Sequence, residues 1–486
     1  MTAAPSTPAP EKLPAELVRL SLTIMLGAIM VALDMTMVNV ALDALQREFH
    51  ATVATIQWIS TGYLLALATV IPLAGWAIER YGAKPLWTVA LGLFITGSVL
   101  CGLAWSAGSL IAFRVVQGLG GGLIMPLAQT ILARAAGPDR IGRVMAVVGV
   151  PAMLGPVLGP VLGGLIVSEA SWRLMFFINV PICIAAVLAT RRATMPATKR
   201  PDAARLDTLG LSLLSPGLVA LVYGLSQAGS HGSFTDGPVL AWMLAGAGLL
   251  AAFAVHALRT RTEPIIDLRL FRERSFTSFS AVVFFFSMAM LGTALLLPLY
   301  YQQVRGESAL HAGLLLAPQG LGMAIALVVA SRLTDRLSPR PIIATGLALT
   351  AAAMLAYTQV DAHTSFALLS AAAFVSGLGI GASLVPAMAG IYKHLPTEAV
   401  ARATSAIRIF QQLGGSFGIA LLAVVLQQHA AGAVTTSGLA AAFADTFWWA
   451  LAITGIALLP TLLLPGGRSD TARPVTPPAP RPAHGT

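Results

Sequence analysis

Charged side chains are scarce in this sequence. Asp, Glu, Lys and Arg make up 10% of the 486 residues, whereas about 25% is usual for a soluble domain. Apolar residues account for 56% of the chain, and the mean hydropathy is +0.80. So few charges cannot cover so much apolar surface in water, which excludes an ordinary soluble globular fold. We therefore predict an all-α polytopic membrane protein.

Cysteine and the common catalytic motifs are also scarce. The two cysteines, Cys101 and Cys183, lie inside apolar stretches and provide neither a disulfide framework nor a metal-binding spacing. The sequence contains no Walker loop, nucleophile elbow or zinc-ligand pattern. It therefore predicts neither an enzyme nor a nucleotide-driven pump, and we expect no metal site, no cofactor and no nucleotide partner.

Long apolar runs dominate what is present. A membrane-spanning helix needs roughly 20 apolar residues, and fourteen such segments can be recognised. They are 17–42, 54–76, 85–106, 108–132, 143–167, 173–190, 207–228, 239–258, 276–302, 310–331, 341–359, 364–389, 404–428 and 441–464. The N-terminal residues 1–16 and the C-terminal residues 466–486 are rich in proline, and we expect them to be disordered cytoplasmic tails.

Basic residues are distributed unequally between the two sides of these spans. Of the 30 Lys and Arg residues, 25 fall in the tails and even-numbered loops, three fall in the opposite loops and two fall inside spans. This is the positive-inside pattern, so we predict a multi-pass protein of a bacterial plasma (inner) membrane with both termini in the cytoplasm. The basic residues that keep these loops in the cytoplasm also account for the net charge of +10, so no nucleic-acid partner is expected.

The chain contains an internal repeat. Residues 75–85 (GWAIERYGAKP) match residues 331–341 (SRLTDRLSPRP), and residues 118–122 (GLGGG) match residues 377–381 (GLGIG). Eight spans separate the equivalent segments. This predicts two parallel six-helix halves, 17–190 and 276–464, with two linker helices in 207–258 between them, which is an architecture of transporters.

Asp34 lies midway along the first span. An ionised carboxylate in hydrocarbon costs about 2.5–3.5 kcal/mol, so such a residue usually faces a cavity or a partner. We interpret Asp34 as a proton carrier or as the counter-charge for a cationic substrate. The alternative is a carboxylate that only bonds a neighbouring helix.

Residues 155–164 (GPVLGPVLGG) place four glycines and two prolines inside the fifth span. Small residues let transmembrane helices approach closely, and proline bends a helix whose neighbours can satisfy the freed carbonyls. The run therefore predicts a tight, kinked helix contact, which either seals the two halves on one side or is ordinary close packing.

Four stretches in sequence order carry a family resemblance: residues 33–42 (LDMTMVNVAL), 75–85, 114–118 (RVVQG) and 155–164. Together they resemble the fourteen-helix drug:proton antiporter branch of the major facilitator superfamily, over residues 17–464. The resemblance implies the major facilitator fold, with two six-helix bundles plus two central helices. It also implies alternating access by rocking of the bundles.

The resemblance also implies roles for individual residues. In this superfamily the first and fourth spans line the central cavity, which brings Arg114 towards Asp34 as a proton-coupling pair. Arg114 is then either a movable partner that switches Asp34 between proton-holding and proton-releasing states, or half of a fixed structural pair. The second half has Ala373 at the position equivalent to Arg114, so proton handling is expected to be concentrated in the first half.

Two sets of residues are expected to change contacts during transport. In the loop motif Glu79 stands for the usual Asp, and Ala83 for a usual basic residue, so a topological anchor is the alternative to a conformational latch. The loop set is Gly75, Glu79, Arg80 and Lys84, with the repeat equivalents Asp335, Arg336 and Arg340. The span-5 set is Gly155, Pro156, Gly159, Pro160, Gly163 and Gly164.

Polar, aromatic and Met side chains in the cavity helices are the candidate substrate contacts, although most such residues in membrane proteins only pack against lipid or helices. The candidates are Asp34, Asn39, Gln57, Tyr63, Gln117, Tyr300, Tyr301, Met388, Arg408 and Gln412.

We predict an exporter of small hydrophobic molecules, including cationic ones, that exchanges them for protons and is driven by the proton gradient. Its partners are the lipid bilayer, the substrate and protons. Two alternatives remain open: a dedicated exporter of one endogenous metabolite or antibiotic, and a non-transporting membrane sensor or receptor built on a transporter fold. A symporter is disfavoured by the residue 155–164 motif.

Overall fold

The structure is a computed structural model of the whole chain, and its described residues form helices and their connections without a β-strand. The described residues are 14–137, 140, 144, 155, 158–159, 162–199, 206–260, 262–334, 337–393 and 399–464.

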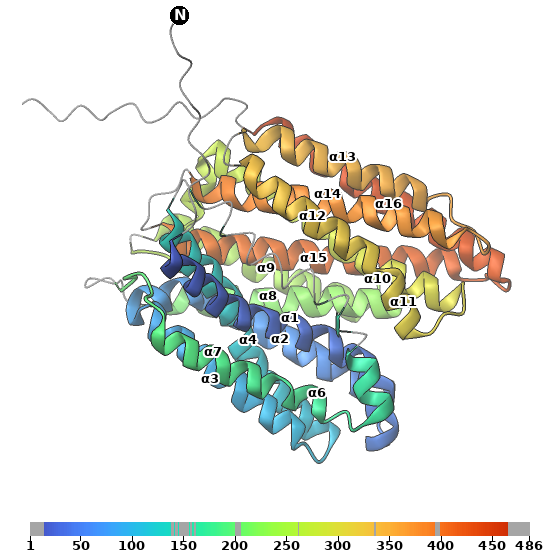
Figure 1. The fold of residues 1–486 in the computed structure, drawn as a ribbon, viewed down its shortest axis with the longest axis horizontal. Helices are drawn as coiled ribbons and strands as arrows, with labels where there is room; N and C mark the ends of the chain where they lie inside the picture. Colours follow the sequence, from blue (N-terminus) through green and yellow to red (C-terminus); the bar gives the residue numbers. More distant parts are fainter. Residues whose placement is uncertain are drawn as a thin grey trace, which may run out of the picture.

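The N-terminal half is built from long helices joined by short turns (Figure 1). Pro181 has no N–H to donate to the carbonyl four residues earlier, and the sixth span is divided at Ile178 just before it. The helices of this half are α1 (Ala15–Phe49), α2 (Val53–Tyr81), α3 (Ala83–Gly102), α4 (Ala107–Ala136), α6 (Leu174–Phe177) and α7 (Asn179–Arg192).

Two linker helices and the C-terminal half follow. The span that precedes α13 is likewise divided, because Pro318 leaves the carbonyl of Leu314 without its helical donor. The elements are α8 (Thr208–His231), α9 (Gly237–Arg259), the short 3-10 helix η1 (Leu268–Arg272), α10 (Arg274–Gln303), α11 (Ala309–Leu315), α12 (Ala317–Thr334), α13 (Pro339–Tyr357), α14 (Phe366–Lys393), α15 (Val400–Ala430) and α16 (Thr436–Leu462).

Thirteen helical segments of the described chain are long and apolar enough to cross a membrane. They coincide with thirteen of the fourteen expected spans, with α6 and α7 forming one span and α11 and α12 another. The remaining expected span, 143–167, lies largely outside the described residues.

The internal repeat is visible in the helix contacts. A Cβ on Gly120 of α4 would meet the backbone of Ala90 and Phe94 in α3. A Cβ on Gly379 of α14 would meet Gly346 and Thr350 in α13. In the sequence repeat Gly379 corresponds to Gly120, Gly346 to Ala90 and Thr350 to Phe94. Glycine therefore allows the same close helix approach in both halves.

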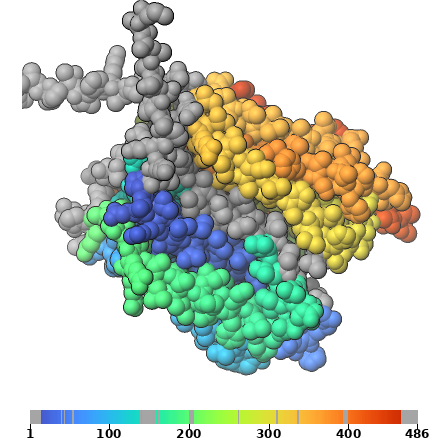
Figure 2. Space-filling view, viewed as in Figure 1, coloured from blue at the N-terminus to red at the C-terminus, as the bar shows by residue number. Residues whose placement is uncertain are grey.

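The two halves lie side by side, and α8 contacts both. Figure 2 shows the N-terminal residues in blue to green on one side and the C-terminal residues in yellow to orange on the other. On α8, the Ser215 hydroxyl donates to the carbonyl of Thr69 in α2, at 2.8 Å. Gln427 of α15 donates to the carbonyl of Gly229 near the other end of α8, also at 2.8 Å. The linker helix therefore bridges α2 and α15.

One end of the molecule is strongly basic. We call it the basic end, defined by Arg80, Lys84, Arg134, Arg191 and Arg192, where α2, α4 and α7 finish and α3 begins. Arg47, Arg173 and Arg305 lie next to helix termini at the opposite end.

Candidate functional site

Asp34 and Arg114 form a buried ion pair. Asp34 projects from α1 and Arg114 from α4, and a guanidinium nitrogen of Arg114 lies 2.6 Å from Asp34 Oδ2. Each side chain is only 1% exposed. The carboxylate therefore faces the helix bundle, where a charge-assisted hydrogen bond offsets part of its desolvation.

The second carboxylate oxygen also accepts hydrogen bonds. Gln117 Nε2 of α4 donates to Asp34 Oδ1 at 2.8 Å, and Asn179 Nδ2 of α7 donates to the same oxygen at 2.9 Å. Both amides also donate to the hydroxyl of Ser98 on α3, at 2.6 and 3.2 Å respectively. One polar cluster therefore joins α1, α3, α4 and α7.

Arg114 has further contacts that hold its guanidinium in place. It lies over the ring of Tyr63 in α2, 4.0 Å from the centroid. It also donates to Gln117 Oε1 at 2.7 Å and to the carbonyl of Ile59 at 3.4 Å. A cation over an aromatic face is stabilised when desolvated, so a movement of Arg114 would break several favourable contacts together.

Two glycines bring the helices of the cluster together. A Cβ on Gly97 of α3 would lie 2.5 Å from the Cα of Gln117, which shows how closely α3 approaches α4 beside the Ser98 hydroxyl. A Cβ on Gly118 would lie 2.6 Å from the carbonyl oxygen of Tyr63, so α4 and α2 are equally close. These small residues position the polar side chains next to them within hydrogen-bonding distance.

Two polar atoms of the cluster are buried without a hydrogen-bond partner among the described residues. They are the hydroxyl of Tyr63 and the amide oxygen of Asn179. Rotation of the Asn179 amide would turn it from a donor to an acceptor opposite Asp34. In this structure the amide is oriented to donate to Asp34 Oδ1.

The glycine-rich run of the fifth span contacts α1 close to Asp34. The Thr36 hydroxyl donates to the carbonyl of Gly155 at 2.9 Å, and a Cβ on Gly159 would overlap Thr36. A Cβ on Gly163 would lie 3.1 Å from the carbonyl of Met37. These described glycines pack against a helix of their own half, as in close packing, and Gly164 has no such neighbour. Pro156 and Pro160 lie outside the described residues.

The loop motif at the end of α2 contacts the C-terminal half. Glu79 is 3% exposed, and its Oε2 lies 3.2 Å from a guanidinium nitrogen of Arg402 in α15. Arg134 lies 3.9 Å from the other oxygen of Glu79, and Arg402 also pairs with Glu263, which lies between α9 and η1. The amide of Gly75 donates to the Ser405 hydroxyl of α15 at 3.1 Å. The two halves are therefore joined at the basic end.

The remaining members of the loop set are placed differently. Lys84 donates to the carbonyls of Arg191 and Ala193 within the N-terminal half, at 3.1 and 3.3 Å. Arg80 is exposed, and Arg340 is half-buried at the start of α13. Asp335 and Arg336 lie outside the described residues.

The candidate substrate residues do not converge on one place. Tyr63 and Gln117 contact the ion pair. Tyr300 and Tyr301 are fully buried in the apolar core of the C-terminal half, where the Tyr300 hydroxyl donates to the carbonyl of Asp361 at 2.6 Å. In this structure the two tyrosines thus pack within one half, and a substrate role for them stays a prediction.

The other candidates lie on several helices. Met388 of α14 is buried and accepts from Gln129 of α4 at 3.9 Å. Arg408 of α15 donates to Gln411 at 3.0 Å, and Gln412 beside it is half-buried. Gln57 is exposed near the start of α2. The side chain of Asn39 lies outside the described part of the chain.

Three residues that make these contacts were not predicted from the sequence as members of the site. Asn179 stands in a stretch, residues 172–181, that weakly resembles the family pattern, but it was not predicted as a site residue. Ser98 gave no signal because small hydroxyl residues are common in transmembrane helices. Arg402 counted only as one of many basic residues at the span ends. Its pairing with Glu79 joins residues 323 positions apart.

Comparisons with known proteins agree with this architecture. The family model of the Major Facilitator Superfamily matches residues 24–419 and 319–484. The chain is 38% identical to "Multidrug resistance protein B homolog" of Mycobacterium tuberculosis over 419 residues, covering 86% of this chain and 77% of that protein. It is 30% identical over 405 residues to "Tetracenomycin C resistance and export protein" of Streptomyces glaucescens, covering 83% of this chain and 75% of that protein.

A further relative is "Multidrug export protein EmrB" of Escherichia coli, which is 30% identical over 409 residues. The match covers 84% of this chain and 80% of that protein. Among solved structures, the human organic anion transporter MFSD10 superposes with a TM-score of 0.64 at 18% identity, covering 93% of this chain and all of that one. A double-Trp mutant of XylE gives 0.66 at 14% identity, with coverage of 94% and 97%. Family match, relatives and fold together show that this multi-pass membrane protein belongs to the Major Facilitator Superfamily and is a transporter rather than an enzyme.

Proposed function

We propose that this protein exports small hydrophobic drugs or antibiotics in exchange for protons. The names of its relatives support the substrate class, because they are called multidrug resistance, multidrug export and tetracenomycin C resistance proteins. The observation that carries the proton coupling is the buried Asp34–Arg114 pair, which joins α1 to α4 inside the N-terminal half.

In the proposed cycle, the proton competes with Arg114 for Asp34. A proton on Oδ2 displaces the donor that now lies 2.6 Å away, and it removes the charge that holds the guanidinium. Arg114 then loses its main electrostatic attraction while keeping the Tyr63 ring. Oδ1 remains an acceptor in the acid, so Gln117 and Asn179 can keep donating to it. Loading of one proton would thus break the Asp34–Arg114 contact between α1 and α4, and its release would let the contact form again.

Movement at α1 can be passed on through its neighbours. Gly155, Gly159 and Gly163 pack directly on α1, against the three residues Ala32, Thr36 and Met37 that lie on either side of Asp34. Bare backbone surfaces allow helices to slide with few side-chain obstacles. We propose that this contact lets α1 shift when Asp34 changes its protonation state.

We further propose that the basic end faces the cytoplasm, as the positive-inside rule requires. The Gly75–Ser405 and Glu79–Arg402 contacts then close the cytoplasmic side in this conformation. Breaking them would open that side for substrate entry, and their re-formation would commit the substrate to release outside.

The decisive experiment is Asp34→Asn in proteoliposomes with an imposed proton gradient. The amide keeps the shape but can neither carry the proton nor pair with Arg114, so gradient-driven efflux is expected to fall to background. Substrate exchange without a gradient should persist. Asp445→Asn, an exposed acid of α16, is the matched control and should retain coupled efflux. Normal coupling by Asp34→Asn would rule out the proposed proton site.

The relatives also support one alternative, a dedicated exporter of a single antibiotic, because some of them are named for one compound. A vesicle screen over chemically unrelated hydrophobic compounds separates the two functions. A broad substrate range supports multidrug export, whereas transport of one structural class supports the dedicated exporter. The absence of flux for every compound, with and without the pH gradient, would favour the sensor or receptor.

A further inference from the structure

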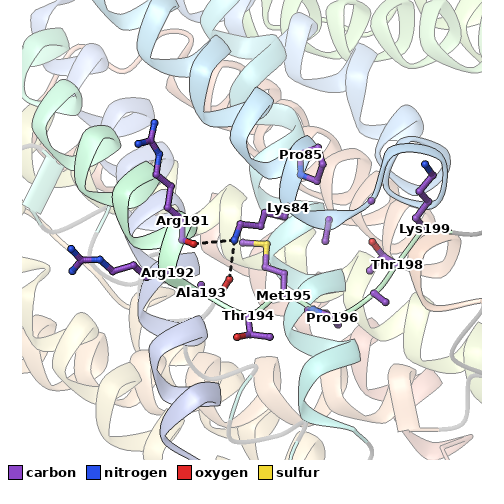
Figure 3. Close-up of a pocket in the computed structure, with 13 residues that line it drawn as sticks. Lys84, Pro85, Arg191, Arg192, Ala193, Thr194, Met195, Pro196, Thr198 and Lys199 are labelled. Carbon is purple, nitrogen blue, oxygen red and sulfur yellow. Dashed lines mark hydrogen bonds between the residues drawn. The ribbon is translucent and has the colours of Figure 1, made fainter.

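A cavity of about 510 Å³ lies at the basic end, away from the ion pair (Figure 3). It is bounded by the α2–α3 turn, residues 82–85, and by the end of α7 with the segment that follows it, residues 191–199. The thirteen described residues that line it include four basic ones, Lys84, Arg191, Arg192 and Lys199, and no acidic one. A cavity with this lining has the electrostatics to attract an anion.

The start of α3 adds backbone donors to this wall. Gly82 is the residue before the helix, and no side chain caps the first turn of α3. Helix N-termini with uncapped amides carry a partial positive charge and bind phosphate groups. Residues 82–85 all line the cavity. Pro85 has no N–H and the Gly82 N–H donates to Ile78, so Ala83 and Lys84 supply the backbone donors at this helix end.

A buried hydroxyl independently indicates a missing acceptor. Thr198 lines the cavity and is 2% exposed, yet its Oγ1 has no hydrogen-bond partner among the described residues. Such a group normally finds a partner, because burying it unpaired is costly. A phosphate oxygen in the cavity would accept from this hydroxyl.

Lys84 connects the two walls of the cavity. Its ammonium has three donors, two of which reach the carbonyls of Arg191 and Ala193 (dashed lines in Figure 3). In the same view Arg191 and Arg192 lie on one side of the cavity and Lys199 on the other. The Arg191 and Arg192 side chains extend away from Lys84, so the basic residues lie on both sides of the cavity and only Lys84 reaches across it.

We propose that this cavity binds a phosphate-bearing anion. The proposal is independent of the proton site. Exposed apolar side chains on the flanking helices, Val89 of α3 and Ile184 and Leu188 of α7, continue the surface that meets lipid. This favours the headgroup of an anionic phospholipid over a soluble phosphate, since such a lipid can place its phosphate in the cavity and its chains along these helices.

The test measures binding to the delipidated, purified full-length protein by native mass spectrometry. Phosphatidylglycerol, phosphatidylcholine and inorganic phosphate are the three probes. The variant Arg192→Gln/Lys199→Gln removes two cavity cations, and Arg259→Gln/Arg272→Gln removes two exposed cations that do not line it. The second pair is the control for loss of net charge.

Phosphatidylglycerol is expected to bind the natural protein more tightly than phosphatidylcholine, with affinity roughly tenfold lower in the cavity variant and nearly unchanged in the control. Thr198→Val should weaken binding a fewfold, and Thr198→Ser should restore it. If inorganic phosphate shows the same variant dependence and the two lipids bind equally, the ligand is a soluble phosphate. Equal phosphatidylglycerol and phosphate binding by the cavity variant and the natural protein would overturn the proposal.

Discussion

The two halves of this transporter share a backbone plan but differ in polar content. Gly120 and Gly379 make equivalent close contacts with the neighbouring helix in each half. At the level of the ion pair, however, the first half has Arg114 and Gln117, and the second has Ala373 and Ser376 at the equivalent repeat positions. Helix packing and charge placement are therefore separable: small residues maintain the scaffold in both halves, and a few polar residues give one half a buried ion pair.

The first prediction introduces the cation of the first half at the equivalent position of the second half. Ala373 is fully buried, so Ala373→Arg would place a large cation in the C-terminal half without the partner that Asp34 provides in the other half. We expect a loss of stability of about 3 kcal/mol or more. Thermal unfolding in detergent measures it, with Ala373→Ser as the control. A well-folded Ala373→Arg protein would show that the second half already offers a counter-charge.

Removing the cation from the first half should also be costly. Arg114→Met leaves Asp34 buried and without its guanidinium, for an expected loss of roughly 3 kcal/mol. Asp34→Asn/Arg114→Met removes both charges and should be more stable than Arg114→Met alone. A double-mutant cycle by thermal unfolding gives the coupling energy. Additive effects of the two substitutions would mean that the pair contributes nothing as a pair.

The shared scaffold predicts matched responses to added methyl groups. Gly120→Ala and Gly379→Ala each force a Cβ into the backbone of the facing helix, and we expect similar losses of about 1–3 kcal/mol. Gly92→Ala and Gly455→Ala meet no atom within 4 Å and should be neutral or slightly stabilising. Unfolding of the four variants in one detergent compares them. A large effect in one half only would contradict structural equivalence of the repeats.

The smallest expected difference lies at the end opposite the basic one. Arg173 donates to Glu48 at 2.8 Å and lowers the pKa of that carboxyl, whereas Arg305 donates to the carbonyls of Ala362 and Thr364. The contribution of Glu48 to the free energy of unfolding is therefore present above the pKa of the free carboxyl and is lost as pH falls through the lowered pKa, while the Arg305 contacts involve no carboxylate. Because the pair is exposed, Glu48→Gln should cost well under about 1 kcal/mol. Unfolding measured at pH 7 and again at acidic pH should show a difference that shrinks as the carboxyl becomes protonated.

Hydropathy alone identified the spans because it is a local property of about 20 consecutive residues. The thirteen described membrane-length helices coincide with predicted ones, and Asp34 and Arg114 were recognisable because charges are rare in such segments. The expected proximity of these two residues came from the family resemblance, and the structure shows the contact itself.

Side-chain partners across the fold depended on the tertiary structure. Ser98 and Asn179 join Asp34 because the rotation of α3 and α7 turns them inward, and Arg402 meets Glu79 because the two halves touch at the basic end. The basic cavity likewise combines residues 82–85 with residues 191–199. Sequence by itself determined which segments enter the membrane, since burial in lipid depends on composition. Only the packed helices decided which polar groups meet, since that depends on how each helix is rotated and how closely its glycines allow a neighbour to approach.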